Sequence, residues 1–352
     1  MSFEIRRGDV LERLREMPAV AFAGCLTDPP YGLGEYRSPQ RKSGKRQNGT
    51  GFMGLAWDAR VPGPETWAEV LRVLKPGAYL LAFGGTRTYH RLTCAIEDAG
   101  FEIRDCLMWL YGQGFPKAKS CLKPAWEPII LARKRGPMLP LAIDACRIET
   151  GDKLGGGATS GSRANHEGWR RPWMDDPVAN ASASERSTQS VKKAEALGRW
   201  PANVILDEQS GAALDAQSGS LISGGFPAKR NADKHSKVYA GWKGEQCLAP
   251  RGMDSGGASR FFYCAKASSA ERNGNTHPTV KPLKLTEYLA RLILPANGGD
   301  LIVPFSGSGS EMVGAQLAGW NHITGIEQDR SYIAIAAKRL RATGKLAIAH
   351  AA

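Results

Sequence analysis

Apolar and polar residues follow two different periods along the first 110 residues, and this pattern predicts strands that alternate with helices. Residues 20–27 and 78–85 are apolar runs of strand length, typical of strands buried on both faces of a parallel sheet. The segment 64–77 repeats apolar residues at helical spacing and ends in Lys-Pro-Gly, which stops a helix. A helix at 88–100 and a strand at 101–110 continue the alternation.

The same alternation returns after residue 276. A helix that begins at Pro282 has apolar residues at positions i, i+4, i+7 and i+8, which form one face. The segments that follow it are a strand at 300–305, a helix at 310–319, a strand at 322–327 and a helix at 331–342. Strands alternating with helices in this way predict an α/β fold with a doubly wound, mostly parallel sheet.

The middle of the chain has a different composition, because Gly, Ser, Pro, Lys and Arg interleave there with isolated aromatic residues. Short segments of regular pattern remain at 126–134, 199–208 and 259–266. We therefore expect residues 1–111 and 276–352 to join in one sheet, and residues 112–275 to form an inserted, loop-rich lobe.

The net charge of the chain indicates what kind of partner it binds. Lys and Arg number 47 against 34 Asp and Glu, a net charge of +13. Such an excess favours a nucleic acid partner, because binding to phosphates releases counterions; a surface charged only for solubility is the alternative. No apolar run approaches the roughly 20 residues of a membrane span. No signal core precedes the first strand, so we expect a cytoplasmic protein associated with the nucleoid.

The cysteines argue against a metal centre. Seven cysteines are scattered along the chain, the count is odd, and no Cys-x-x-Cys pair occurs. This spacing favours reduced thiols over structural zinc or a disulfide framework, and we predict no metal site.

A glycine turn lies between a predicted strand and a predicted helix, in the sequence FSGSGSEM that begins at Phe305. Glycines at such a point let a ligand approach the N-terminus of the helix. Glu327 follows Gly307 by 20 residues at the end of the next strand, where a carboxylate can accept both hydroxyls of a ribose. A Rossmann dinucleotide site has this layout, but its third glycine is replaced by Met312. A nucleoside without a pyrophosphate fits better, and S-adenosylmethionine is the obvious one; an ordinary tight turn is the alternative.

A second turn, Asp-Pro-Pro-Tyr at residues 28–31, directly follows the first buried strand. This turn resembles the signature of the amino-methyltransferases that methylate the exocyclic nitrogen of adenine or cytosine in DNA. A strand-end turn with a buried tyrosine is the alternative interpretation, and the glycine turn, Glu327 and the basic charge together disfavour it.

The chemistry of the reaction explains each residue of this turn. An exocyclic amine is a poor nucleophile, because its lone pair is delocalised into the ring. Asp28 and the carbonyl of Pro29 can accept its two hydrogens in tetrahedral directions, which favours the reacting geometry. Pro29 and Pro30 stiffen the turn, and Tyr31 offers a flat face on which a flipped-out base stacks.

The order of the two motifs resembles the beta group of DNA amino-methyltransferases, in which the catalytic turn precedes the cofactor turn. The resemblance implies that residues 1–111 are the catalytic half, that 276–352 are the cofactor half, and that 112–275 recognise the target sequence. It also implies double-stranded DNA as the substrate and allows a homodimer, which no residue of the sequence indicates.

Further positions of the family's motifs can be carried over. Gly-Asp-x-Leu near the N-terminus makes Asp9 a candidate for contact with the cofactor adenine; a helix N-cap is the alternative, and both can hold. The segment Thr-His-Pro-Thr-Val-Lys-Pro resembles the one beside the methionine end of the cofactor. In addition to Glu327, the residues expected at the cofactor are therefore Asp9, Thr279, Lys281, Phe305, Gly307 and Gly309. One departure is Val303, which stands where the family usually has the acid of Asp-Pro-Phe.

Basic residues just beyond the catalytic turn are candidates for DNA phosphates. They are Arg41, Lys42, Lys45 and Arg46, and a solvated loop is the alternative interpretation.

The sequence as a whole predicts an S-adenosylmethionine-dependent methyltransferase acting on adenine N6 in DNA, either with a restriction partner or as an orphan enzyme. Cytosine N4 is the nearest rival target, because the family's preference for Asp-Pro-Pro-Tyr at adenine has exceptions. A nicotinamide oxidoreductase leaves this turn unexplained. A non-catalytic DNA-binding protein and a methyltransferase of RNA or protein amides are the remaining hypotheses.

Overall fold

The computed structural model describes residues 2–32, 58–114, 119, 122–150, 176–223, 254–265 and 280–350. The predicted DNA-contact residues Arg41, Lys42, Lys45 and Arg46, and the predicted cofactor residue Thr279, lie outside the described residues. The chain divides into two compact units. The first, the sheet unit, comprises Met1–Cys146, Ala202–Ser210 and Cys264–Ala352, and the second comprises Arg147–Pro201 and Gly211–Tyr263.

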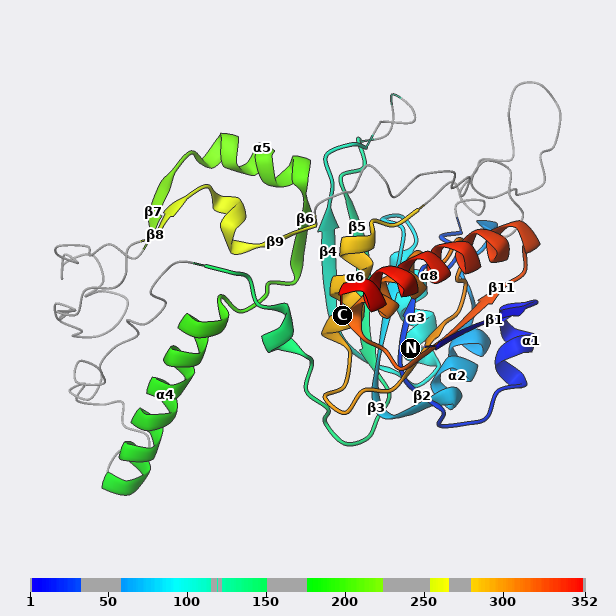
Figure 1. The fold of residues 1–352 in the computed structure, drawn as a ribbon, viewed down its shortest axis with the longest axis horizontal. Helices are drawn as coiled ribbons and strands as arrows, with labels where there is room; N and C mark the ends of the chain where they lie inside the picture. The colour runs from blue at the N-terminus through cyan, green and yellow to red at the C-terminus, as the bar shows by residue number, and fades with distance from the viewer. Residues whose placement is uncertain are drawn as a thin grey trace. The chain divides into compact units, whose positions relative to one another are not determined.

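A nine-stranded sheet runs through the sheet unit in the order β1-β11-β10-β2-β3-β5-β4-β6-β9 (Figure 1). Its strands are β1 (Ser2–Arg7), β2 (Phe22–Thr27), β3 (Leu74–Phe83), β4 (Glu102–Leu110), β5 (Trp126–Arg133), β6 (Val204–Asp207), β9 (Tyr263–Ala265), β10 (Asp300–Val303) and β11 (His322–Glu327). β5 runs antiparallel to both β3 and β4. The pairings of β1 with β11, β11 with β10, β10 with β2, β2 with β3, and β4 with β6 are parallel. This mostly parallel α/β sheet confirms the predicted fold class.

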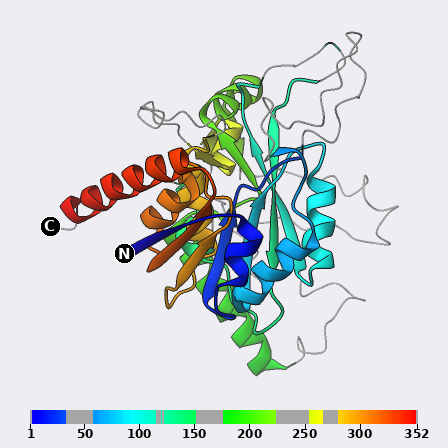
Figure 2. The same cartoon turned by 90° about the vertical axis from the view of Figure 1, so that its right-hand side faces the viewer.

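Helices cover both faces of the sheet. They are α1 (Val10–Arg15), α2 (Pro64–Val73), α3 (Tyr89–Asp98), α6 (Leu283–Leu292), α7 (Ser310–Ala318) and α8 (Arg330–His350). Figure 2 shows α1, α2 and α3 on one face and α6, α7 and α8 on the other. The chain moves across the sheet in opposite directions from β2 and from β10, so right-handed connections place the two sets of helices on opposite faces.

Local sequence accounts for most of these elements. All six residues of β2 are buried, as their continuous apolar run predicts. α2 begins with Pro64 in its first turn and turns Trp67 and Val70 into the core. α7 lies between Gly309 (φ 81°) and Gly319 (φ 103°), two left-handed positions that suit glycine.

The sheet continues beyond the boundary predicted at residue 111. β5, β6 and β9 are the three segments of regular pattern within the predicted insert, and all three join the main sheet. The second unit therefore starts after Cys146 and is interrupted by Ala202–Ser210, where the sequence predicts a continuous insert over 112–275. The reason is that strand pairing is non-local: a four-residue strand such as β6 carries no local signal of its partner.

The second unit contains α4 (Pro177–Leu197), a hairpin of β7 (Leu221–Ser223) with β8 (Asp254–Gly256), and a 3-10 helix at Ala258–Phe261. Its remaining helical residues are the C-terminal part of α5 (Glu208–Ser218). Asp215 accepts hydrogen bonds from the backbone N–H and the hydroxyl of Ser259, at 2.8 and 2.7 Å.

Within the described ranges, no helix is long and apolar enough to cross a membrane.

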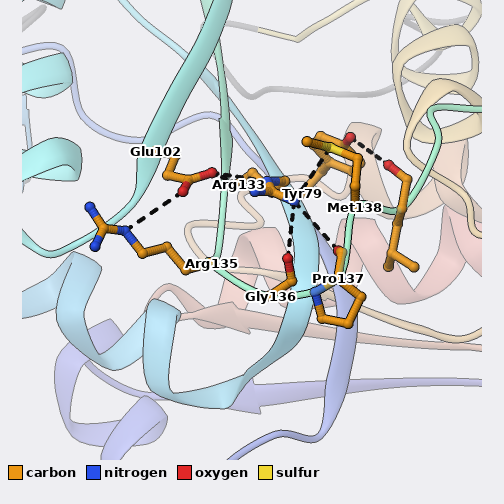
Figure 3. Close-up of polar contacts among 8 residues, drawn as sticks. Tyr79, Glu102, Arg133, Arg135, Gly136, Pro137 and Met138 are labelled. Atoms are coloured by element: carbon orange, nitrogen blue, oxygen red, sulfur yellow. Dashed lines mark hydrogen bonds and ion pairs between the residues drawn. The ribbon is translucent and has the colours of Figure 1, made fainter.

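Arg133, a buried residue, links the antiparallel strands β4 and β5 to the turn that follows β5 (Figure 3). Arg133, at the end of β5, donates from Nη2 to Glu102 Oε2 at 2.6 Å and is 6% exposed. Its Nη1 lies 3.4 Å from the carbonyls of Gly136 and Pro137, so the guanidinium ties the following turn to β4. Tyr79 on β3 holds the same turn by donating to the carbonyl of Leu139 at 2.6 Å.

The two central parallel strands, β2 and β10, carry the two sequence motifs at their carboxyl ends. Leu301 pairs with Gly24, and Ile302 pairs with Cys25. Further toward the carboxyl ends, the hydroxyl of Thr27 donates to the carbonyl of Pro304. The order of the strands reverses direction between β2 and β10, and in open α/β sheets ligands bind beyond the carboxyl ends at such a point.

Gly24 on β2 lies close to the ring of Trp320, and a pair of substitutions can test this contact. A Cβ atom added at Gly24 would lie 2.7 Å from Cη2 of Trp320, which is fully buried and donates from Nε1 to Ala290 O at 3.0 Å. We expect Gly24→Ala to lower the free energy of unfolding by about 1–3 kcal/mol, despite the roughly 0.5–1 kcal/mol that replacing a strand glycine gains. Urea denaturation measures the change.

The matched background is Trp320→Phe, which removes the indole atom that would clash. In that background Gly24→Ala should cost clearly less, because the two sites share one contact. An equal cost in both backgrounds contradicts the packing described for Gly24.

Candidate active site

The carboxyl ends of β2, β10 and β11 surround a cavity of about 750 Å³. The predicted site residues that line it are Asp9, Asp28, Pro29, Pro30, Tyr31, Lys281, Phe305, Gly307 and Glu327. The two turns, which lie at opposite ends of the chain, therefore share one cavity. Its volume is in the range of sites for small molecules and cofactors.

The catalytic turn is held from two sides. Asp58, which precedes α2, accepts the backbone N–H groups of Tyr31 and Gly32 on Oδ1, at 2.7 and 3.2 Å. On the other side, Lys281 Nζ lies 2.9 Å from Asp28 Oδ2. Asp28 Oδ1 is buried and has no hydrogen-bond partner among the described residues. One oxygen of this carboxylate is thus fixed, and the other remains available to a ligand.

Lys281 lies at the centre of a buried charge cluster. Besides Asp28, its Nζ contacts Glu127 Oε2 at 3.0 Å and donates to the Tyr31 hydroxyl at 2.8 Å. It also lies 4.8 Å from the centre of the Phe83 ring. Burial alone lowers the pKa of Lys281, but the two carboxylates outweigh burial and raise the pKa above the ordinary lysine value. The ammonium group therefore stays charged, and its three protons all have partners within the protein.

Tyr31 is held in its neutral form. Burial raises the pKa of its hydroxyl well above the usual value, and the charges of Asp28 and Glu127 raise it further. The hydroxyl donates to Glu127 Oε2 at 3.1 Å. The ring is thus fixed at one edge of the cavity by its own hydroxyl and by its backbone contact to Asp58.

The glycine turn has an unusual backbone. Phe305 has φ of 58° and Gly307 has φ of 49°, so a non-glycine residue occupies the left-handed region beside the cavity. Such a conformation is uncommon, and strained residues of this kind cluster at functional sites. Arg339 on α8 supports the turn by donating to the carbonyl of Ser308 at 2.7 Å and to the hydroxyl of Ser310 at 3.1 Å.

Glu327 closes the glycine turn at the end of β11. Its Oε2 accepts the N–H of Gly307 at 2.9 Å, and its Oε1 accepts the N–H of Asp329 at 2.8 Å. Burial raises the pKa of this carboxyl above the ordinary value. Each oxygen retains a lone pair, so the carboxylate fits the two hydroxyls of a ribose without losing its backbone contacts.

Two predicted cofactor residues have structural roles as well. Asp9 is the N-cap of α1, since its Oδ1 accepts from the N–H groups of Leu11 and Glu12 at 2.9 and 3.3 Å; this confirms the N-cap interpretation. It also lines the cavity, and its contact with the cofactor adenine stays a prediction. Gly309 does not line the cavity: its N–H donates to Ser306 O at 2.8 Å, and an added Cβ would lie 2.8 Å from Ala336 Cβ. The structure gives Gly309 a role in packing α7 against α8.

The residues present fit S-adenosylmethionine. Gly307 and Glu327 line the cavity, Glu327 offers acceptor oxygens that a ribose could use, and buried carboxylate oxygens without partners among the described residues suit a cationic ligand. Across the described ranges, no group of three or more His, Cys, Asp or Glu residues is placed to hold a metal ion.

A profile of the N6/N4 family, described as DNA methylase, matches residues 22–338. The chain belongs to this family. Its members take the methyl group from S-adenosylmethionine, so membership in this methylase family also confirms the predicted cofactor. The predicted function is confirmed at the level of a DNA methyltransferase of adenine or cytosine amino groups.

Several solved structures resemble this methylase. M1.HpyAVI is 13% identical with a TM-score of 0.47, over 96% of this chain and 98% of that one. TTHA0409 from Thermus thermophilus, complexed with S-adenosyl-L-methionine, is 15% identical with a TM-score of 0.44, over 97% and 96%. The PvuII DNA methyltransferase, described as cytosine-N4-specific, is 14% identical with a TM-score of 0.47, over 96% and 86%. These weak likenesses add nothing to the family assignment. A search of curated proteins finds no significant match.

Three site residues of this methylase are absent from the sequence-based prediction. Glu127 lies on β5, in the segment assigned to the insert, and Asp58 follows the basic region beyond the catalytic turn. Glu311 is within the predicted glycine motif, but only its burial distinguishes it from a solvated helix residue. The sequence predicts Lys281 at the cofactor carboxylate, whereas the structure pairs it with Asp28, Glu127 and Tyr31. The cofactor role would require it to leave these partners.

A substitution of Lys281 can test whether the buried charge cluster stabilises the protein. Lys281→Met keeps the length of the side chain but leaves two carboxylates at the cavity without their shared cation. We expect the free energy of unfolding at pH 7 to fall by about 3–5 kcal/mol, the usual cost of breaking a buried ion pair from one side. Urea denaturation of the variant and the parent protein measures the loss.

The control is Lys284→Met, in the first turn of the adjoining helix. Lys284 contacts Glu287 at 3.0 Å with 58% of its side chain exposed, so its loss should cost about 1 kcal/mol or less. Equal losses in the two variants would show that the buried cluster does not stabilise the protein.

Proposed function

We propose that this methylase transfers the methyl group of S-adenosylmethionine to N6 of an adenine flipped out of duplex DNA. The observation that carries the proposal is the buried Oδ1 of Asp28, which has no hydrogen-bond partner among the described residues and belongs to a residue that lines the same cavity as the glycine turn. An acceptor in this position can receive a hydrogen of the base amine next to the site of the cofactor.

The contacts of Asp28 support a positioning of the amine rather than its full deprotonation. Lys281 holds Oδ2 at 2.9 Å, so the carboxylate keeps one orientation and directs Oδ1 to the ligand. A second acceptor, the carbonyl of Pro29, would complete the tetrahedral arrangement about the amine nitrogen. When bound, the cofactor supplies an electrophilic methyl group and its own leaving group. The amine can therefore release its proton after transfer.

Tyr31 provides the surface on which the flipped base would stack. Tyr31 lines the cavity, and its hydroxyl is fixed by Lys281 and Glu127. A ring that cannot rotate away loses little entropy when a base stacks on it. Base flipping itself, the phosphate contacts predicted for Arg41, Lys42, Lys45 and Arg46, target recognition by the inserted lobe, and a homodimer stay predictions.

Adenine is proposed over cytosine because the turn reads Asp-Pro-Pro-Tyr, the pattern that the family favours for N6. The test is incubation with tritiated S-adenosylmethionine and DNA, followed by digestion and mass spectrometry of the nucleosides. Detection of N6-methyladenine supports the proposal. Detection of N4-methylcytosine instead would show that cytosine N4 is the target and would refute the assignment of adenine.

Asp28→Ala should lower the rate of methyl transfer at least about 10²-fold, because the amine loses its acceptor in the transition state. Binding of S-adenosylhomocysteine, measured by calorimetry, should survive. The matched control is Asp98→Ala, an exposed aspartate at the end of α3, which should keep full activity. Near-normal turnover of Asp28→Ala would refute the role given to this carboxylate.

Gly307→Val should abolish binding of S-adenosylhomocysteine, because Gly307 lines the cavity in a left-handed conformation and a branched side chain there would both narrow the site and strain the turn. Gly219→Val is the control, because Gly219 has φ of 61°, no atom within 4 Å of an added Cβ, and no place in this cavity. Both variants carry similar backbone strain, but only Gly307→Val should lose the ligand. Calorimetry of the pair decides whether the glycine turn binds the cofactor.

A further inference from the structure

Glu311 is a buried carboxylate that the proposed mechanism leaves unused. It is the second residue of α7, lines the cavity, and is 4% exposed. Its Oε1 is buried and has no hydrogen-bond partner among the described residues. An acidic residue in the first turn of a helix is common, but such residues normally point their oxygens to water.

A buried acceptor without a partner is costly, because it loses its hydrogen bonds to water and gains none. The charged groups that act on Glu311 come from three elements: Asp28 at the end of β2, Lys281 before α6, and Arg339 on α8. Burial, and next the charge of Asp28, raise its pKa to about 7, against the lowering effects of a hydrogen bond from its own backbone N–H, of Lys281 and of Arg339. The site therefore has a carboxyl group whose charge the surrounding cations do not balance.

We propose that Glu311 receives the α-ammonium group of S-adenosylmethionine and loses its proton when the cofactor binds. This inference rests on the proposed function, because it concerns the same cavity. Glu327 is placed for the ribose and Asp28 for the methyl acceptor, and Glu311 lies in the cavity with both. The sulfonium is also cationic, but it has no N–H to donate. The ammonium has three, which suits an oxygen that lacks a hydrogen bond.

The affinity of three nucleosides tests this assignment at pH 8. S-adenosylhomocysteine has the ammonium and the carboxylate, its decarboxylated form has only the ammonium, and 5′-methylthioadenosine has neither. Glu311→Gln should weaken binding of the first two about tenfold, the difference between a charge-assisted and a neutral hydrogen bond. It should leave the affinity of 5′-methylthioadenosine unchanged.

Glu65→Gln is the matched control, since Glu65 is in the first turn of α2, exposed, and outside the cavity. It should change none of the three affinities. Thermal melting checks the fold: Glu311→Gln should be at least as stable as the parent protein at pH 8, where the buried carboxyl is ionised and destabilises the fold.

The pH dependence gives an independent readout. Binding of S-adenosylhomocysteine to the parent protein should tighten from pH 6 to pH 8, because the ligand needs the ionised form of Glu311, whose pKa is about 7. Glu311→Gln should remove this change. Calorimetry of S-adenosylhomocysteine binding at pH 6.5, in two buffers with different ionisation enthalpies, should show that the parent protein releases a proton on binding. The Glu311→Gln variant should release none.

Each contrary outcome overturns the assignment in a distinguishable way. Unchanged affinities in Glu311→Gln, or equal losses for all three nucleosides, reject the ammonium contact and leave the proposed function intact. A loss for S-adenosylhomocysteine without a loss for its decarboxylated form assigns Glu311 to the carboxylate end and also rejects the contact. If the parent protein binds none of these nucleosides, this inference and the proposed cofactor site fail together.

Discussion

The parallel pairing of β2 with β10 is the constraint on which the site depends. It places the carboxyl ends of two strands, far apart in the chain, side by side at the point where the sheet reverses its direction. The hydrogen bond from Thr27 to the carbonyl of Pro304 joins these ends one residue before Asp28 and Phe305, which line the cavity. A turn with a carboxylate and a turn with glycines thus line one cavity. Neither motif has this meaning alone, since each is also an ordinary way to end a buried strand.

Charge balance is the second requirement, because several carboxylates line one cavity. Lys281 pairs with two of them and fixes Tyr31 as well, so the Asp-Pro-Pro-Tyr turn is held by contacts within the protein. Preorganisation of this kind avoids reordering at the moment of reaction. One oxygen of Glu311, Oε1, is buried and has no hydrogen-bond partner among the described residues, so it is suited to the cationic cofactor that we propose for this cavity.

The backbone of the glycine turn shows how the rest of the fold supports the site. Phe305 keeps a left-handed conformation beside the cavity, while Arg339 and Glu327 hold the turn from the adjoining helix and strand. The two glycines of this turn have different surroundings. Gly307 borders the cavity, whereas Gly309 allows α8 to approach, so one short motif shapes the cavity and also permits close packing of helices.

Local patterns along the chain are enough to predict the strands and helices at both of its ends, the two turns, their order and the family. These follow from residue spacing, because periods of two and of 3.6 residues are visible in any short window. Packing between distant elements settles the rest: β5 and β6 join the sheet, Glu127 and Lys281 form one cluster, and Oε1 of Glu311 is buried without a hydrogen-bond partner among the described residues. Lys281 and Tyr31 are 250 residues apart, so no periodicity along the chain can reveal a contact that only the folded sheet creates.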